Sequence, residues 1–286
     1  MESTVGICGA GTMGRGISLT IASRGVPVIL YDMNLDMLSS ATSWIEKELT
    51  EAVEKKRIGT SEKINILDRI KYTNLIADCH ASLFIEAVTE KTETKSTLFK
   101  ELSKINPGET IFATNTSSLS ITRIAEQTPF PEKIIGLHFF NPANRMKLVE
   151  IIKTKYVTEE LMKWAQAFIL RLGKIPVICS DSPGFIVNRV ARPFYLEALR
   201  LAENEIADIF QIDQLMESAG FRMGPFHLMD LIGHDINYTV SSSVYEALGR
   251  PARLEPSSMQ KALVQKGALG KKTGKGFFQY DKQSNE

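Results

Sequence analysis

The sequence Val5-Gly6-Ile7-Cys8-Gly9-Ala10-Gly11-Thr12-Met13-Gly14 is a short apolar run that leads directly into a glycine-rich turn. The apolar run predicts a buried strand, and the spacing Gly-x-Gly-x-x-Gly is typical of the turn between a strand and a helix that bind a dinucleotide. In such a turn Gly9 permits the tight bend, Gly11 leaves room for a pyrophosphate, and Gly14 lets the helix pack closely on the strand. The first N–H groups of the helix then face the phosphates. Because glycines also occur in ordinary turns, the motif needs support from the residues that follow it.

Asp32 provides this support. It ends a second predicted strand, residues 26–31, and lies 18 residues after Gly14. This is close to the spacing at which an acidic residue binds the adenosine ribose of a dinucleotide. A carboxylate accepts hydrogen bonds from both ribose hydroxyls and repels a 2′-phosphate, and no arginine follows in residues 33–35. The sequence therefore predicts a site for NAD, in preference to NADP, formed by Gly9, Ala10, Gly11, Thr12, Met13, Gly14 and Asp32.

The composition argues against several other classes of protein. The chain has 286 residues, of which 43% are hydrophobic, and its net charge is +1. We therefore predict neither a nucleic-acid-binding surface nor a polybasic membrane contact. No apolar run is long enough for a transmembrane helix, and residues 1–4 leave no room for a signal peptide before the first strand. Three widely spaced cysteines favour neither a disulfide framework nor a metal site, so a cytoplasmic location is expected.

Strands and helices alternate through the first part of the chain. Strands are predicted over residues 83–88 and 110–114, with an amphipathic helix between them. This alternation predicts a Rossmann-type, doubly wound and mostly parallel sheet, which binds ligands at the carboxyl ends of its strands. Glu90, Asn115 and Ser117 follow such ends. The alternative for Ser117 is the N-cap of the next helix.

His138 and Glu150 each interrupt the apolar sequence of a predicted strand, and they lie 12 residues apart. A buried carboxylate is costly unless it is paired, so we expect the two side chains to meet across a tight return of the chain. The residues alone leave two alternatives, a buried structural pair and a catalytic dyad. The predicted dinucleotide site favours the dyad, because hydride transfer from an alcohol needs a base for the hydroxyl proton.

A domain boundary is expected at Asp181-Ser182-Pro183-Gly184, where the pattern of alternating strands and helices ends. This gives a dinucleotide-binding domain at residues 1–183 and an all-α C-terminal domain at residues 184–286. Asn188 lies near the boundary, where ligands bind between domains, although a core or capping asparagine is the alternative.

Several segments together resemble the 3-hydroxyacyl-CoA dehydrogenase family, in particular its short bacterial 3-hydroxybutyryl-CoA dehydrogenase branch. They occur in family order along essentially the whole chain. They are residues 9–14, 86–90 (Glu-Ala-Val-Thr-Glu), 115–121 (Asn-Thr-Ser-Ser-Leu-Ser-Ile), 136–142 (Gly-Leu-His-Phe-Phe-Asn-Pro), 146–150 (Met-Lys-Leu-Val-Glu), 181–189 (Asp-Ser-Pro-Gly-Phe-Ile-Val-Asn-Arg) and 270–277 (Gly-Lys-Lys-Thr-Gly-Lys-Gly-Phe).

The resemblance implies a role for each candidate residue. His138 would be the general base, Glu150 would orient its imidazole, and Ser117 and Asn188 would hydrogen-bond the reacting oxygen. NAD contacts are implied for Asp32, Glu90, Lys95, Ser117, Asn141 and Lys272. Lys55 and Ser117 match coenzyme A contacts, whereas Glu48 stands where the family can place a serine. The resemblance also implies a homodimer, through the helical domain with the apolar faces of Phe194, Leu196 and Leu199.

The resemblance implies reversible, NAD-dependent oxidation of a short-chain (3S)-3-hydroxyacyl-CoA, with 3-hydroxybutyryl-CoA as the expected substrate. The runs Phe221–Pro225 and Gly233–Asn237 resemble family members that act on 3-hydroxyadipyl-CoA in phenylacetate breakdown, which is the alternative substrate. Arg145, in a loop where relatives carry apolar residues, is either exposed to solvent or paired with a carboxylate at the far end of the acyl chain. A sugar-acid dehydrogenase and a non-catalytic NAD-binding protein are the remaining alternatives.

Overall fold

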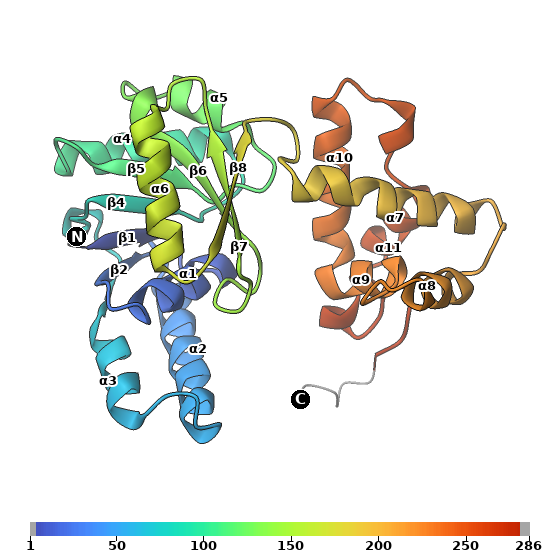
Figure 1. The fold of residues 1–286 in the computed structure, drawn as a ribbon, viewed down its shortest axis with the longest axis horizontal. Helices are drawn as coiled ribbons and strands as arrows, with labels where there is room; N and C mark the ends of the chain where they lie inside the picture. The colour runs from blue at the N-terminus through green and yellow to red at the C-terminus, as the bar shows by residue number, and fades with distance from the viewer. Residues whose placement is uncertain (1–3, 281–286) are drawn as a thin grey trace. The chain divides into compact units, whose positions relative to one another are not determined.

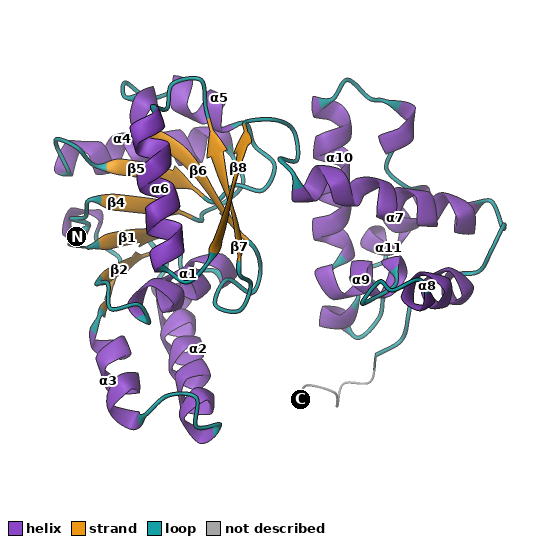
Figure 2. Cartoon of the chain, in the orientation of Figure 1, coloured by secondary structure: helices purple, strands orange, loops and turns teal. Residues whose placement is uncertain are grey.

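A computed structural model describes residues 4–280 of the chain, which fold into two compact units that divide between Ser182 and Pro183. Figure 1 traces the chain through these units. The strands of the sheet all belong to the first unit, and the second is built of helices (Figure 2). The predicted order, a sheet domain followed by an all-α domain, is confirmed.

The first unit alternates strands and helices. Its elements are β1 (Val5–Cys8), α1 (Thr12–Ala22), β2 (Val28–Tyr31), α2 (Leu35–Glu54), α3 (Thr60–Asp68), β3 (Ile70–Thr73), β4 (Leu83–Glu86), α4 (Thr92–Ile105), β5 (Ile111–Thr114), α5 (Ile121–Glu126), β6 (Ile134–Phe139), β7 (Leu148–Lys153), α6 (Glu159–Arg171) and β8 (Ile175–Ser180). The sequence patterns do not predict α3 and β3. In α3 only Ile66 is buried, so the apolar periodicity is weak there.

The sheet has the strand order β3-β2-β1-β4-β5-β6-β7-β8. Neighbouring strands are parallel, except that β6 and β7 are antiparallel. The predicted mostly parallel, doubly wound sheet is therefore confirmed. The strand order reverses direction between β1 and β4, and in open sheets of this kind the ligand crevice lies there, beyond the carboxyl ends of the strands.

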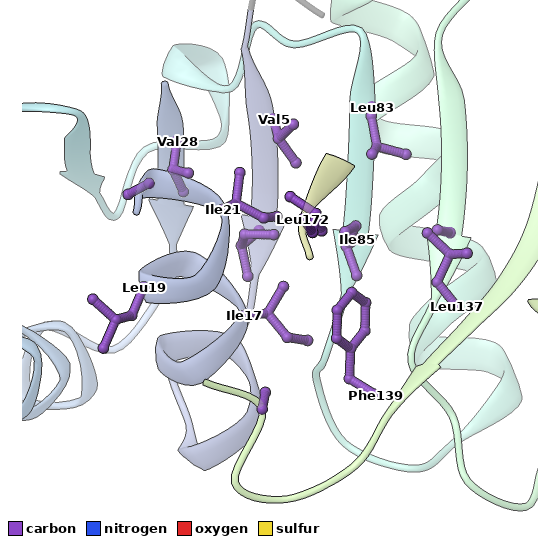
Figure 3. Packing of buried hydrophobic residues seen from close by; sticks show 14 of the residues in the cluster. Val5, Ile17, Leu19, Ile21, Val28, Leu83, Ile85, Leu137, Phe139 and Leu172 are labelled. Atoms are coloured by element: carbon purple, nitrogen blue, oxygen red, sulfur yellow. The ribbon is translucent and has the colours of Figure 1, made fainter. Parts of the chain in front are cut away.

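Alternate residues of the central strands pack on opposite faces of the sheet, as the pleat requires. In β4, Leu83 and Ile85 belong to the core that α1, α2 and α6 cover. Figure 3 shows this core, in which α1 packs its apolar side against the strands. Phe84 faces the other way and stacks on Phe112 of β5, which also contacts Phe99 of α4. Because helices cover both faces, polar side chains collect at the strand ends.

The second unit is a helical bundle with its own core. Its helices are α7 (Val187–Glu203), α8 (Ile209–Ser218), α9 (Pro225–Ile232), α10 (His234–Ala247) and α11 (Ser258–Gln265). Leu196 and Leu199 of α7 are buried in this core with Phe226 and Met229. The expectation that these two leucines need cover from a second subunit is therefore wrong, because their own unit covers them.

Two further features of the second unit differ from what the sequence pattern predicts. The pattern of residues 229–248 predicts a single helix, but the structure divides this segment into α9 and α10 at Gly233, whose φ is 100°. The glycine-rich residues 267–280 predict a solvated connection, but they form two β-bridges, Gly270 to Lys275 and Lys275 to Gln279. Within residues 4–280, no helix is long and apolar enough to cross a membrane.

Candidate active site

The turn between β1 and α1 has the geometry that a dinucleotide pyrophosphate requires. Gly9 has a φ of 102°, which favours glycine. A Cβ on Gly14 would lie 1.7 Å from the carbonyl oxygen of Gly9, so no side chain fits between the turn and the helix. A Cβ on Gly11 would meet only the terminal methyl of Met37, at 3.9 Å, and this side of the turn is open. The first N–H groups of α1 lack partners within the helix and suit a phosphate.

Asp32 joins the end of β2 to this turn. Its Oδ2 accepts a hydrogen bond from the N–H of Ala10 at 2.8 Å, and its Oδ1 accepts from the N–H of Asn34 at 2.9 Å. The carboxylate is thus held beside the glycine turn, where the predicted ribose contact requires it. Thr12 and Met13 form the first turn of α1.

Replacing Asp32 by alanine should weaken NAD binding. Hydrogen bonds to a charged group contribute about 1.5–3 kcal/mol, so we expect KM for NAD to rise about 10- to 100-fold. The ratio of KM for NADP to KM for NAD should fall, since the repulsion between Asp32 and a 2′-phosphate is removed. Initial rates with both cofactors measure this, and Asp36→Ala, in the first turn of α2, is the matched control. Equal losses with both cofactors would contradict the ribose contact.

A buried ionic network lies at the end of β4. Oε1 of Glu86 accepts hydrogen bonds from Nζ of Lys95 at 2.7 Å and from the N–H of Val88, and Oε2 accepts from the hydroxyl of Thr114 at 2.8 Å. Burial raises the pKa of Glu86. Lys95 also pairs with Glu90, at 3.1 Å. The lysine therefore links a fixed carboxylate in the sheet to the loop that carries the candidate site.

Glu90 organises the loop after β5. Its Oε1 accepts from the hydroxyl of Thr116, from the N–H of Ser117 at 3.0 Å and from the N–H of Ser118. Burial by itself would raise the pKa of Glu90, but Lys95 and these donors lower it overall. The alternative that Ser117 caps the next helix is wrong, because Ser120 is the N-cap of α5.

His138 and Glu150 face each other across the antiparallel pair β6–β7. They are directly opposed in register, and Nδ1 of His138 lies 2.7 Å from Oε2 of Glu150. The side chains are 7% and 1% exposed. The expected contact between histidine and carboxylate is present. When Nδ1 donates its proton to the carboxylate, Nε2 is left as an acceptor, which is the form that a general base needs.

The loop after β5 is also tied to the end of β6. The side-chain oxygen of Asn115 accepts from the N–H of Phe139 at 2.7 Å. Asn141 is exposed and precedes a cis peptide bond to Pro142. Glu90, Ser117 and His138 thus lie at or just after the ends of β4, β5 and β6, with Lys95 of α4 bound to Glu90 and Glu150 of β7 paired with His138.

Two basic residues, Lys55 and Arg145, lie beside helix α2 and pair with its glutamates. Lys55 follows α2 and pairs with Glu51 at 3.1 Å on an exposed face. Arg145 is 65% exposed and pairs with Glu48, which also accepts from the side-chain amide of Asn144. A cavity of about 220 Å³ lies here and is lined by residues of α1, α2 and the 141–145 loop. The exposure of Arg145 fits the first of its two alternatives, and pairing with a carboxylate of the acyl chain stays a prediction.

Asn188 and Lys272 belong to the second unit. Asn188 lies in the first turn of α7, where its carbonyl accepts from Nε of Arg192. Lys272 lies in the C-terminal loop and pairs with Asp235 at 2.6 Å.

The sequence patterns gave no signal for Asp230, which anchors this loop. Its carboxylate accepts from the N–H groups of Phe277 and Phe278 and pairs with Nε2 of His234 at 2.6 Å. Its partners in the C-terminal loop lie 47 or more residues further along the chain. Among the described residues there is no group of three His, Cys, Asp or Glu side chains that could hold a metal ion.

Comparisons with known proteins bear on this arrangement. Residues 4–182 match the NAD binding domain of 3-hydroxyacyl-CoA dehydrogenase, and residues 184–280 match the C-terminal domain of the same enzyme. The chain belongs to the 3-hydroxyacyl-CoA dehydrogenase family. The family and the relatives named below support NAD as the cofactor and an NAD-dependent oxidoreductase activity on 3-hydroxyacyl-CoA.

Three relatives illustrate the match. The chain is 43% identical to 3-hydroxyadipyl-CoA dehydrogenase of Escherichia coli (strain K12) over 279 residues, which cover 97% of this chain and 59% of that protein. It is 36% identical to a probable 3-hydroxybutyryl-CoA dehydrogenase of Bacillus subtilis, with 98% of each chain covered. The solved structure of (S)-3-hydroxybutyryl-CoA dehydrogenase from Ralstonia eutropha superposes with a TM-score of 0.93 at 33% identity, over 99% of this chain and 100% of that one.

Proposed function

We propose that this chain oxidises a short-chain (3S)-3-hydroxyacyl-CoA, with 3-hydroxybutyryl-CoA as the reference substrate, to the 3-oxoacyl-CoA, and that it catalyses the reverse reaction as well. The observation that supports this most strongly is the His138–Glu150 pair, buried at the same edge of the sheet as the open glycine turn.

Bound NAD would supply the acceptor for the hydride that leaves C3 of the substrate. The chain supplies the remaining chemistry. Nε2 of His138 takes the proton of the 3-hydroxyl group, and Glu150 orients the imidazole and stabilises its charged form. Ser117, held by Glu90, hydrogen-bonds the reacting oxygen, and Asn188 is its second proposed donor. In the reverse direction the imidazolium returns the proton.

The remaining contacts are assigned by their chemistry. Gly9, Ala10, Gly11, Thr12, Met13 and Gly14 hold the pyrophosphate, and Asp32 holds the ribose. Glu90, Lys95, Asn141 and Lys272 are further proposed cofactor contacts, while Lys55 is proposed to bind a phosphate of coenzyme A. The ion pair of Lys55 with Glu51 is exposed, so exchanging this partner for a phosphate costs little.

Consumption of NADH with a panel of 3-oxoacyl-CoA esters tests the proposal. We expect turnover with 3-oxobutyryl-CoA and much slower turnover when NADPH replaces NADH. Equal rates with the free 3-oxo acid would favour a sugar-acid type of substrate instead, because that enzyme would not need coenzyme A. Tight NADH binding without turnover of any ester would indicate a non-catalytic protein.

We also propose a cytoplasmic homodimer. Support for the dimer is the exposed apolar surface of the helical unit, where Val190, Phe210 and Leu215 are each about two-thirds exposed or more. Light scattering coupled to gel filtration tests the oligomeric state, and a monomer at micromolar concentration would contradict it. The three cysteines, all free, suit a reducing compartment.

A further inference from the structure

Arg192 is a buried cation of the helical unit that the reaction described above does not use. It lies in α7 and is 3% exposed. Its Nε donates to the carbonyl oxygen of Asn188 at 3.0 Å, and its Nη1 donates to the carbonyl oxygen of Asn237 at 3.0 Å and to the hydroxyl of Ser241 at 2.8 Å. The guanidinium also lies over the ring of Tyr195, 4.9 Å from its centroid. All these partners are neutral.

Within residues 4–280 no carboxylate lies within ion-pair distance of Arg192, and Nη2 takes part in none of its hydrogen bonds. Burial without a counter-charge lowers the pKa of the guanidinium to about 10. Nearby, the side-chain nitrogen of Asn237, a residue 1% exposed, has no hydrogen-bond partner in this part of the chain. A buried charge is costly unless it is paired, so these donors suit an anion that comes with a ligand.

The position of Arg192 identifies the part of the substrate that it would meet. It follows Asn188 by one helical turn, so the two side chains share a face of α7 and their Cβ atoms are about 5–6 Å apart. Asn188 is the proposed donor to the reacting oxygen at C3. The phosphates of coenzyme A lie at the opposite end of the ester from the acyl chain. An anion beside C3 therefore belongs to the acyl chain itself.

We propose that Arg192, assisted by Asn237, binds a carboxylate at the far end of the acyl chain, so that the preferred substrate is the coenzyme A ester of a 3-hydroxydicarboxylic acid. A guanidinium matches a carboxylate in two parallel hydrogen bonds. The separation along α7 suits a carboxylate a few bonds beyond C3, as in a six-carbon acid. Arg145, the other arginine considered for this role, is exposed and already paired with Glu48. This inference rests on the proposed dehydrogenase function.

Two six-carbon esters test the inference in the unaltered protein. 3-Oxoadipyl-CoA and 3-oxohexanoyl-CoA have the same chain length and differ in a terminal carboxylate or methyl group. We expect kcat/KM to be about 10- to 100-fold higher for the adipyl ester, because hydrogen bonds to a charged group contribute about 1.5–3 kcal/mol. Equal values for the two esters, with 3-oxobutyryl-CoA still reduced, would overturn the role of Arg192 and leave the dehydrogenase function intact. Failure of all three esters would instead overturn the proposed function.

Substitution then assigns the preference to Arg192. Arg192→Met should remove most of the difference in kcat/KM between the adipyl and hexanoyl esters, mainly by raising KM for the adipyl ester. Arg200→Met is the matched control, because it removes a positive charge from the same helix, and it should leave the ratio of the two kcat/KM values unchanged. Arg192→Lys, which keeps the charge but not the two parallel bonds, should give an intermediate ratio and serves if the methionine variant does not fold. A structural role alone would lower kcat/KM for both esters equally, and that result would contradict the proposal.

Discussion

His138→Gln is expected to lower kcat by about 10²- to 10⁴-fold, the usual contribution of a general base. Glutamine keeps a polar side chain of similar size beside Glu150 but cannot take the hydroxyl proton. Binding of NADH, measured by fluorescence titration, should be unchanged, because His138 lies on β6 and the glycine turn follows β1. The loss should therefore appear in turnover and not in cofactor affinity.

Glu150→Gln is the companion variant. It keeps a hydrogen-bond acceptor for Nδ1 of His138 but removes the negative charge that stabilises the imidazolium. We expect a smaller loss of kcat than for His138→Gln. If His138→Gln turned over at near the unaltered rate, the histidine–carboxylate pair would be structural, which is the alternative that the sequence alone leaves open.

Asp230→Ala is expected to destabilise the helical unit by more than about 3 kcal/mol, since it leaves several buried hydrogen-bond donors without an acceptor, each at a cost of about 1–3 kcal/mol. The carboxylate is fully buried, and its two oxygens bind His234, the N–H groups of Phe277 and Phe278 and the hydroxyl of Tyr280. Urea unfolding followed by circular dichroism measures the change.

Asp235→Ala is the matched control, because the ion pair of Asp235 with Lys272 is partly exposed and such pairs contribute about 1 kcal/mol or less. Burial would raise the pKa of Asp230, but its hydrogen bonds lower it overall. Its contribution to stability is therefore complete above the unfolded pKa of about 3.9 and is lost as the pH falls through the lower folded value. Equal losses for the two variants at neutral pH would show that Asp230 does not anchor the C-terminal loop.

Features that depend on neighbouring residues could be predicted from the sequence. The glycine turn and Asp32 follow from one strand–helix–strand unit, and the His138–Glu150 contact follows from two strands joined by a short return. In each case the burial of an apolar run determines where the polar residues must lie.

Features that depend on distant residues could not be predicted. Asp230 and Phe277 are separated by 47 positions, and Arg192 and Asn237 by 45. No apolar periodicity of the sequence links the two members of either pair. Asp230, Arg192 and Asn237 each resemble an ordinary polar residue of a helix. The division between α9 and α10 was missed for a different reason: a glycine within an apolar helical pattern does not reveal that its φ is positive.

The proposed function requires that hydride pass directly between NAD and C3 of the acyl group. Reduction of 3-oxobutyryl-CoA with NADH carrying deuterium at C4 of the nicotinamide ring, on the face that is transferred, tests it most directly. Mass spectrometry of the product should find one deuterium atom, located at C3 of 3-hydroxybutyryl-CoA. Each C4 face is labelled in a separate cofactor sample, and product without deuterium at C3 from both samples would contradict direct hydride transfer.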